Sequence, residues 1–232
     1  MIPEPNLSTI AALIGDPARA TILSALLSGQ ALPASDLAYR AHITPQTASS
    51  HLAKLVDGGL LDVTRTGRHR YYRLKNAEVA HALEILTSLA APPRLKTPRD
   101  SAAYDALCFA RTCYDHLAGQ MGVALTQALI DKGIVTADDQ SYVLTEAGTQ
   151  WLVSWNIEEE ALRQGRRLFA RPCVDWSERR DHMAGALGSA ITKQLFEKGW
   201  IMRLPGHRAV RVTDVGRRGF RDEFEIESKI FS

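Results

Sequence analysis

Apolar residues recur at helical spacing along residues 1–90, and prolines and glycines interrupt them where helices would begin or end. The pattern predicts helices over Ser8–Ile14, Pro17–Leu27, Pro33–Arg40, Pro45–Asp57 and Asn76–Leu89. Asp16 and Thr44 each precede a proline, so each can cap a helix whose first residue tolerates the missing N–H. Gly58 and Gly59 are expected to end the helix that Thr44 begins.

Two further segments of this half favour strands. Leu60–Thr64 and His69–Leu74 are rich in β-forming residues, and the turn Arg65–Arg68 joins them into a hairpin. Residues 41–44 form a tight turn before the Pro45–Asp57 helix. Helix, turn, polar-faced helix and basic hairpin, in that order, predict a winged helix-turn-helix.

The second half of the chain contains an internal repeat. Asp115–Gly133 aligns without gaps on Asp181–Gly199, with ten of nineteen positions identical, and Leu144–Gly148 resembles Val212–Gly216. Such agreement predicts a duplicated unit with internal pseudo-symmetry. Each repeat is expected to contain a helix, a Gly-x-x-Gly turn, a second helix, a hairpin and a helix start capped by threonine, which makes it winged-helix-like.

A proline-rich segment separates the two halves. Ala91–Arg99 contains three prolines, which end helices and favour extended backbone. We therefore expect an N-terminal domain over 1–90, a linker over 91–99 and a duplicated domain over 100–232, with repeats at about 100–156 and 170–222. The predicted fold class is mainly α with small β-hairpins (α+β).

Composition restricts the class of protein. The chain has 45% hydrophobic and 23% charged residues, which is typical of a globular protein, and its net charge is only +2. No apolar run approaches the roughly 18 residues that span a bilayer, and the first residues lack the pattern of a signal peptide. Three irregularly spaced cysteines predict no disulfide framework. We expect a cytoplasmic, reduced protein with no membrane partner.

The candidate DNA-binding residues lie on the Pro45–Asp57 helix and on the hairpin. Burial of Ala48, Leu52 and Leu55 would leave the polar positions of this helix outside or at its edges. Glutamine, serine and threonine near a helix N-terminus can bond base edges, and a basic hairpin tip can reach phosphates. The candidates are Thr44, Gln46, Thr47, Ser49, Ser50, His51, Lys54, Arg65, Arg68, His69 and Arg70.

Three segments, Asp16–Leu27, Ile43–Leu61 and Thr64–Leu74, resemble the ArsR/SmtB family of bacterial transcriptional repressors. The resemblance covers roughly residues 8–90. It implies a homodimer joined through the first and last helices of the domain. It also implies a palindromic double-stranded DNA operator, and it assigns base reading to Gln46, Thr47, Ser49, Ser50 and His51.

The sequence departs from the family's metal sensors. Ser35–Arg40 lacks the paired cysteines that such sensors often carry on this helix, and the last helix offers a lone His81 with Glu84. The family's usual metal sites are therefore not expected, and the resemblance does not identify the effector.

The duplicated domain offers other candidate ligands. Cys113 and His116 lie three apart on a predicted helix, which places them on one face, and Cys173 and His182 form a similar pair in the second repeat. Pooled across the pseudo-symmetry axis, the four could form a tetrahedral site. Alternatively, the histidines bond the backbone or the paired aspartates and the cysteines pack as small hydrophobes. A thiol sensor is a third reading, since an arginine lies near each cysteine.

An organic effector is also open, because Trp176, Trp151, Trp155, Trp200 and Phe169 could line an apolar pocket, although such residues more often belong to a core. No nucleotide-binding loop, metalloprotease motif or nucleophile elbow occurs, so we expect no cofactor and no enzymatic activity. The sequence thus predicts a homodimeric regulator that binds an operator and is released by a small-molecule or metal effector. The alternative is a winged-helix module that binds another protein.

Overall fold

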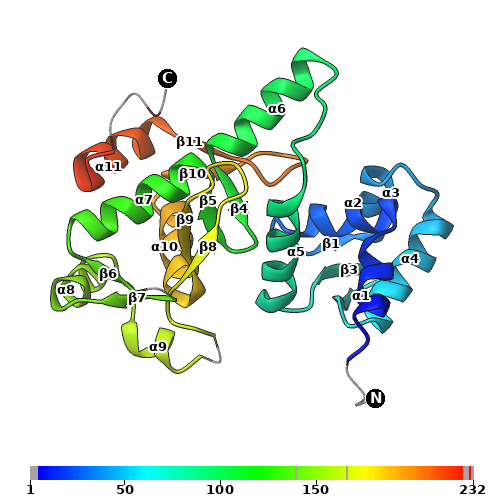
Figure 1. The fold of residues 1–232 in the computed structure, drawn as a ribbon, viewed down its shortest axis with the longest axis horizontal. Helices are drawn as coiled ribbons and strands as arrows, with labels where there is room; N and C mark the ends of the chain where they lie inside the picture. Colours follow the sequence, from blue (N-terminus) through cyan, green and yellow to red (C-terminus); the bar gives the residue numbers. More distant parts are fainter. Residues whose placement is uncertain (1–4, 139, 166, 227–229, 231–232) are drawn as a thin grey trace. The chain divides into compact units, whose positions relative to one another are not determined.

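A computed structural model describes residues 5–138, 140–165, 167–226 and 230 of the chain (Figure 1). The chain divides into two compact units, unit 1 over residues 1–83 and unit 2 over residues 84–232. The division falls inside helix α5 (Ala77–Leu89), ahead of the proline-rich segment at which the sequence predicts a linker. That segment has no regular structure until α6 begins at Pro98, inside the expected linker.

Unit 1 alternates helices with a small antiparallel sheet. Its elements are α1 (Leu7–Ile14), α2 (Pro17–Leu26), β1 (Leu32–Pro33), α3 (Ala34–Arg40), α4 (Pro45–Asp57), β2 (Leu61–Thr66), β3 (His69–Leu74) and the start of α5. The strand order is β1-β3-β2, and β2 pairs with β3 from Leu61↔Leu74 to Thr66↔His69. The arrangement is a winged helix-turn-helix in which β2 and β3 form the wing.

The helix starts of unit 1 follow from their caps. The Asp16 carboxylate accepts a hydrogen bond from the Arg19 backbone N–H, and the Thr44 hydroxyl accepts one from the Thr47 N–H. Each cap satisfies a donor that the first helical turn leaves without a partner. The apolar face of α4 is fully buried at Ala48, Leu52 and Leu55, as its helical spacing predicts. This burial fixes which face of α4 remains outside.

Unit 2 consists of short hairpins alternating with helices. After the end of α5, its elements are α6 (Pro98–Phe109), β4 (Arg111–Cys113), β5 (His116–Ala118), α7 (Gln120–Asp131), β6 (Val135–Asp138), β7 (Ser141–Leu144), α8 (Glu146–Ser154), α9 (Glu159–Arg163), β8 (Arg171–Val174), β9 (Asp181–Ala184), α10 (Gly185–Glu197), β10 (Ile201–Arg203), β11 (Val210–Val212) and α11 (Asp214–Phe224). Each strand pair is antiparallel.

The predicted duplication is visible in the order of these elements. Hairpin β4–β5, helix α7, hairpin β6–β7 and helix α8 recur as β8–β9, α10, β10–β11 and α11. The last helix of each repeat starts in the same way, because Thr145 caps the Gly148 N–H and Thr213 caps the Gly216 N–H. Unit 2 therefore contains two winged-helix-like repeats, and the predicted fold class is confirmed.

The two repeats exchange contacts across their pseudo-symmetry axis. The Leu117 N–H of the first repeat donates to the Thr192 hydroxyl at 2.8 Å, and the Met183 N–H of the second donates to the Thr126 hydroxyl at 2.8 Å. Hairpin β4–β5 thus packs on α10 and hairpin β8–β9 on α7, with β5 beside β9 (Figure 1). One buried apolar core includes residues from both repeats.

The structure corrects two features of the sequence analysis. The segments Gly119–Gly122 and Gly185–Gly188 are not turns between two helices, because a hairpin precedes each of them and each forms the start of the following helix, α7 or α10. Cys113 and His116 do not lie on a helix; they face each other in the β4–β5 hairpin, as Cys173 and His182 do in β8–β9. These short strands are buried and lack the alternation that marks a half-exposed strand, so their pattern resembled a helix. The second hairpin has a longer turn, residues 175–180, and this explains why Cys113 and Cys173 do not align without a gap.

No single helix in the described part of the chain is long and apolar enough to cross a membrane. One strongly bent pair, α1 with α2, meets the criteria only when the two helices are taken together, by length and composition alone.

Candidate functional site

The outer face of α4 presents polar side chains along one side of unit 1. Gln46, Thr47, Ser50 and Lys54 are exposed, while the opposite face of the helix is buried. The N-terminus of the helix lies in the same region, so its N–H groups add a partial positive charge. Side-chain amides and hydroxyls beside such a terminus can contact base edges and phosphates together.

Three other candidates on this helix already have partners within the unit. The Thr44 hydroxyl caps the helix, and the Ser49 hydroxyl donates to the Pro45 carbonyl at 2.9 Å. His51 is half-buried, and its Nδ1 lies 3.1 Å from an Arg19 nitrogen and 3.9 Å from an Asp16 carboxylate oxygen. These contacts give Thr44 and His51 a positioning role in the local structure, and base reading by Ser49 and His51 stays a prediction.

The β2–β3 wing carries an uncompensated positive charge. Arg65 and Arg70 occupy directly opposite positions in the two strands, and Arg68 and His69 lie at the exposed tip. Like charges at opposite positions destabilise a hairpin. Within the described part of the chain, none of the three arginines forms an ion pair, whereas Arg73 at the base of the wing lies 3.6 Å from Asp62. The wing can therefore accept an anion such as a phosphate.

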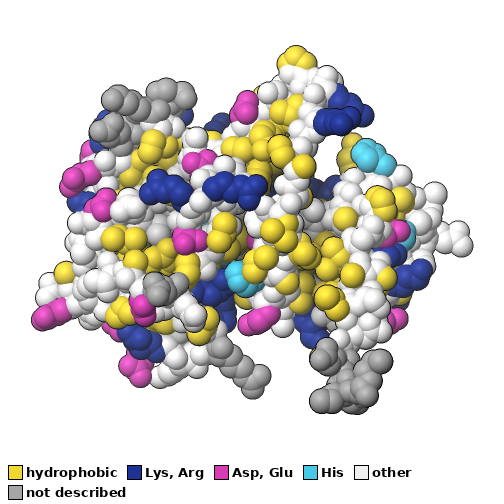
Figure 2. All heavy atoms as spheres, viewed as in Figure 1, with side chains coloured by type: hydrophobic (Ala, Val, Ile, Leu, Met, Phe, Trp, Pro, Cys, Tyr) yellow, Lys and Arg dark blue, Asp and Glu magenta, His cyan; other side chains and the backbone are white. Residues whose placement is uncertain are grey.

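Charges of both signs lie on the face of the molecule that Figure 2 shows. On the face shown in Figure 2, lysine and arginine side chains are interspersed with aspartate and glutamate. This mixture agrees with the net charge of +2. Any attraction for nucleic acid must come from local groups such as the wing.

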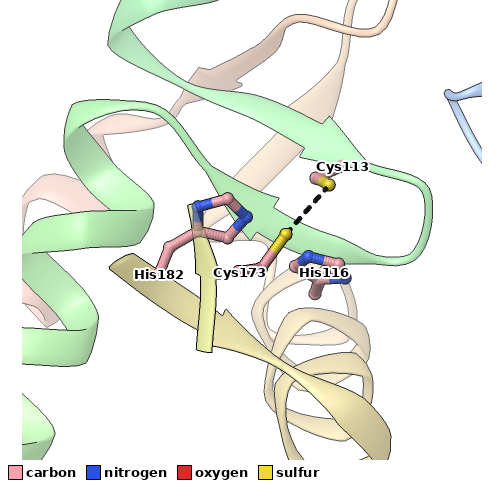
Figure 3. A group of neighbouring side chains, drawn as sticks. All are labelled: Cys113, His116, Cys173 and His182. Atoms are coloured by element: carbon pink, nitrogen blue, oxygen red, sulfur yellow. Dashed lines mark hydrogen bonds between the residues drawn. The ribbon is translucent and has the colours of Figure 1, made fainter. Parts of the chain in front are cut away.

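A second candidate site lies in unit 2, where the structure brings the four predicted cysteine and histidine residues together. One ligand atom from each of Cys113, His116, Cys173 and His182 lies within 4.8 Å of all the others, and all four side chains are buried. Figure 3 shows one cysteine and one histidine pointing inward from each hairpin. The two sulfur atoms are 4.0 Å apart, within hydrogen-bond distance for thiols, and do not form a disulfide.

Carboxylates stand behind both imidazoles. The Nδ1 atom of His116 lies 3.3 Å from Asp115 Oδ1, and that of His182 lies 3.2 Å from Asp175 Oδ2, the latter within ion-pair distance but without the alignment of a hydrogen bond. The Nε2 atoms of both rings are buried, and neither has a hydrogen-bond partner among the described residues. Buried nitrogen atoms normally have such a partner.

The ionisation of these groups reflects their neighbours. Burial would lower the pKa of His182, but Asp175 and Cys173 outweigh it and raise this pKa to about 9. Burial would raise the pKa of Asp115, yet His116 and Arg167 lower it to about 2. The adjacent Cys173 thiol and burial both raise the pKa of Cys113 well above its ordinary value.

Asp175 is a site residue that the sequence analysis missed, and its partner is Arg111, the arginine that the sequence places near Cys113. Both side chains are fully buried, and Arg111 Nη2 donates to Asp175 Oδ1 at 2.8 Å. The second carboxylate oxygen of Asp175 accepts from the Gly119 N–H at 2.7 Å, in addition to its contact with His182. Arg111 begins β4 and Asp175 begins the turn after β8, so the pairing crosses repeats and could not be read from spacing.

The tryptophans do not form a single pocket. Trp155 is fully buried, with Trp151 at 4.7 Å and Trp200 at 5.6 Å between ring centroids, so these three belong to the core. Phe169 lies under the Arg163 guanidinium. Trp176 stands apart, with the Arg111 guanidinium over its ring at 4.2 Å. It lines a cavity of about 430 Å³ together with Thr87, Tyr104, Leu107 and residues 90–93.

Comparison with known proteins identifies a helix-turn-helix domain in unit 1 and a relative that spans nearly the whole chain. A model of the helix-turn-helix domain matches residues 14–64. An uncharacterized HTH-type transcriptional regulator, YdfF of Bacillus subtilis, is 43% identical over 97% of this chain and 99% of its own length. Among solved structures, reduced HlyU from Vibrio cholerae (26% identity, 37% of this chain, 88% of that chain, TM-score 0.34) is similar to it. The cadmium metal-sensor CMTR from Mycobacterium tuberculosis is also similar to it (30% identity, 40% of this chain, 95% of that chain, TM-score 0.33).

The winged helix-turn-helix, taken together with a relative of this identity and coverage, defines the class of protein. The protein is a transcriptional regulator with a helix-turn-helix DNA-binding domain. Within that class, the chain belongs to the same family of HTH-type transcriptional regulators as YdfF, and its resemblance to the ArsR/SmtB family rests on the motifs of residues 8–90. The relative spans the duplicated half as well, so unit 2 is part of this kind of regulator and not an addition peculiar to one chain.

Proposed function

We propose that the chain represses transcription by binding a palindromic operator as a homodimer and that an effector bound by the duplicated half releases it. In this proposal residues 1–90 bind DNA and dimerise, residues 91–99 link, and residues 100–232 respond to the effector. The observation that carries the proposal is the pairing, within unit 1, of an exposed polar helix face with a wing in which Arg65, Arg68 and Arg70 form no ion pair with any described residue.

Exposed apolar residues on the first and last helices support the homodimer. Helix α1 has no buried residue although it is largely apolar, and its Leu7 is 78% exposed. Helix α5 exposes Ile85, Leu86 and Leu89, the last at 78%. Apolar side chains left in solvent on a helix mark a contact surface for a partner. A symmetric dimer would use the same surface on both subunits.

We assign base reading to Gln46 and Ser50. The test compares the affinity of each variant for the operator with its affinity for random DNA. The operator is first selected from a randomised duplex pool with the full-length chain. Gln46→Ala and Ser50→Ala should then each weaken operator binding by roughly 1–3 kcal/mol for a good base contact, with a smaller effect on random DNA. Ser24→Ala, an exposed serine on α2, is the matched control and should bind like the wild type.

The outcome separates the parts of the proposal. Equal losses on both DNAs would contradict base reading while leaving backbone binding intact. A footprint without two-fold symmetry, or a monomer in sedimentation at the DNA-binding concentration, would contradict the palindromic operator and the homodimer. Added effector is expected to lower operator affinity, and an increase would contradict release.

A further inference from the structure

We propose that Cys113, His116, Cys173 and His182 bind one zinc(II) ion in a closed tetrahedral site that joins the two repeats of unit 2. The four ligand atoms lie within 4.8 Å of one another before any ion is added. A tetrahedral zinc site with Zn–S of about 2.3 Å and Zn–N of about 2.0 Å places sulfurs about 3.8 Å apart and nitrogens about 3.3 Å apart. The observed sulfur separation of 4.0 Å requires only a small contraction.

The donor set selects the metal. Two thiolates and two imidazoles in tetrahedral arrangement suit zinc, whereas magnesium and calcium require oxygen ligands. All four ligands come from the protein, so the coordination shell is filled and no position stays open for water or substrate. Sites of this closed kind stabilise structure and do not catalyse reactions.

The surroundings of the histidines fit metal binding more closely than they fit packing alone. A metal-bound histidine usually directs its other ring nitrogen at a carboxylate, which fixes the ring and its tautomer. Asp115 and Asp175 stand at the Nδ1 atoms of His116 and His182, which leaves the two buried Nε2 atoms directed away from the carboxylates. A buried imidazole nitrogen without a hydrogen-bond partner can give up its proton and offer its lone pair to a metal, because metal binding releases the protons of its ligands.

The pseudo-symmetry explains why the four residues meet. Each cysteine stands directly opposite its histidine in a hairpin, and the hairpins lie side by side with β5 against β9. The backbone of α7 approaches His182 and that of α10 approaches His116: a side-chain carbon at Gly122 or Gly188 would lie 3.5 or 3.4 Å from the Cβ atom of the respective histidine. Each repeat therefore supplies two of the four ligands, and its helix packs against the histidine that the other repeat supplies.

The site differs in place from the positions at which the family's metal sensors carry their ligands. It lies in the duplicated half, outside the winged helix-turn-helix, and it uses none of the residues of Ser35–Arg40 or of α5. Its existence does not depend on the proposed operator or on the proposed dimer.

The experiment uses the untagged full-length chain, purified under reducing conditions without chelator. We expect about one zinc ion per chain, and after exchange a cobalt(II) spectrum with intense tetrahedral d–d bands and a sulfur-to-cobalt charge-transfer band. Chelation should lower the Tm of unit 2, and added zinc should restore it, because an ion that binds only the folded state stabilises it.

Variants assign the ligands. Cys113→Ser and Cys173→Ser should each remove most of the sulfur-to-cobalt band, and His116→Gln should shift the d–d bands. Cys108→Ser is the matched control, because Cys108 lies outside the cluster, and it should retain metal and spectrum. Asp115→Asn keeps all four ligands and should weaken metal binding by about 10–100-fold, as the loss of a supporting carboxylate usually does.

Two results would overturn the proposal. One is wild-type protein that carries little metal, gives no tetrahedral cobalt spectrum and shows the same Tm with chelator and with zinc. The other is a metal stoichiometry and cobalt spectrum unchanged in both cluster-cysteine variants, which would place the ion elsewhere. The first result is measured on the wild-type protein alone. The proposal can therefore be overturned even if a variant fails to fold.

Discussion

Single residues in unit 2 are fixed by backbone geometry as much as by chemistry. Gly119 and Gly185 occupy equivalent places at the ends of the cluster hairpins, and both have positive φ, at 78° and 89°. A side-chain carbon at Gly119 would lie 2.5 Å from the Cys108 carbonyl oxygen, and one at Gly185 would lie 2.8 Å from that of Leu168. Glycine is required here both by the backbone conformation and by the space.

Gly119→Ala should therefore lower the unfolding free energy of unit 2 by about 3 kcal/mol or more, since strain of this backbone conformation costs about 1–3 kcal/mol and the backbone clash adds to it. Gly133→Ala is the matched control, with φ of 65° and no neighbouring atom within 4 Å of the new carbon. It should cost only about 1–2 kcal/mol. Urea denaturation followed by tryptophan fluorescence measures both, and equal losses would contradict the steric argument.

At the scale of elements, α4 and the wing were predictable because the residues that begin and end elements agree with the pattern of apolar positions between them. Pro45 and Gly58 bound the helix, and its apolar positions fall on one face. The hairpins β4–β5 and β8–β9 were not predictable in the same way, since strands of three or four residues are too short to show an alternating pattern. The cluster residues were identified by type, but their convergence depends on hairpin pairing and on the turn 175–180, which spacing alone does not reveal.

The wing, as an element, should contribute affinity without sequence preference. Arg65→Ala and Arg68→Ala are expected to weaken binding to operator and random DNA alike, and each lost phosphate contact should reduce the log–log salt dependence by about 0.9. Arg73→Ala is the control, because this arginine pairs with Asp62 at the base of the same hairpin. An unchanged slope in the Arg65 and Arg68 variants would mean that the wing does not touch the DNA backbone.

For unit 2 as a whole, stability depends on the contacts that the repeats exchange. The Thr126 and Thr192 hydroxyls each accept a buried N–H from the opposite repeat and donate to a carbonyl of their own helix. The pairs are related by the pseudo-symmetry, so neither repeat has its full set of hydrogen bonds without the other. This mutual dependence makes the duplicated half one folding unit.

Thr126→Val and Thr192→Val should each leave one buried N–H without a partner and lower the unfolding free energy of unit 2 by about 1–3 kcal/mol. The two losses should be similar in size because the two environments are equivalent. Thr136→Val, on the exposed part of β6, should change stability little. Thermal or urea unfolding of the full-length variants tests this, and a large loss in only one of the two buried variants would contradict the equivalence.

Because the repeats that exchange contacts belong to one chain, assembly of the cluster does not depend on the protein concentration. A cluster built from one hairpin of each of two separate subunits would come apart on dilution, at a concentration set by the subunit affinity. Here both hairpins belong to one chain, so each meets the other at a fixed, high effective concentration. The four cysteine and histidine side chains therefore stay assembled however few copies of the protein a cell contains.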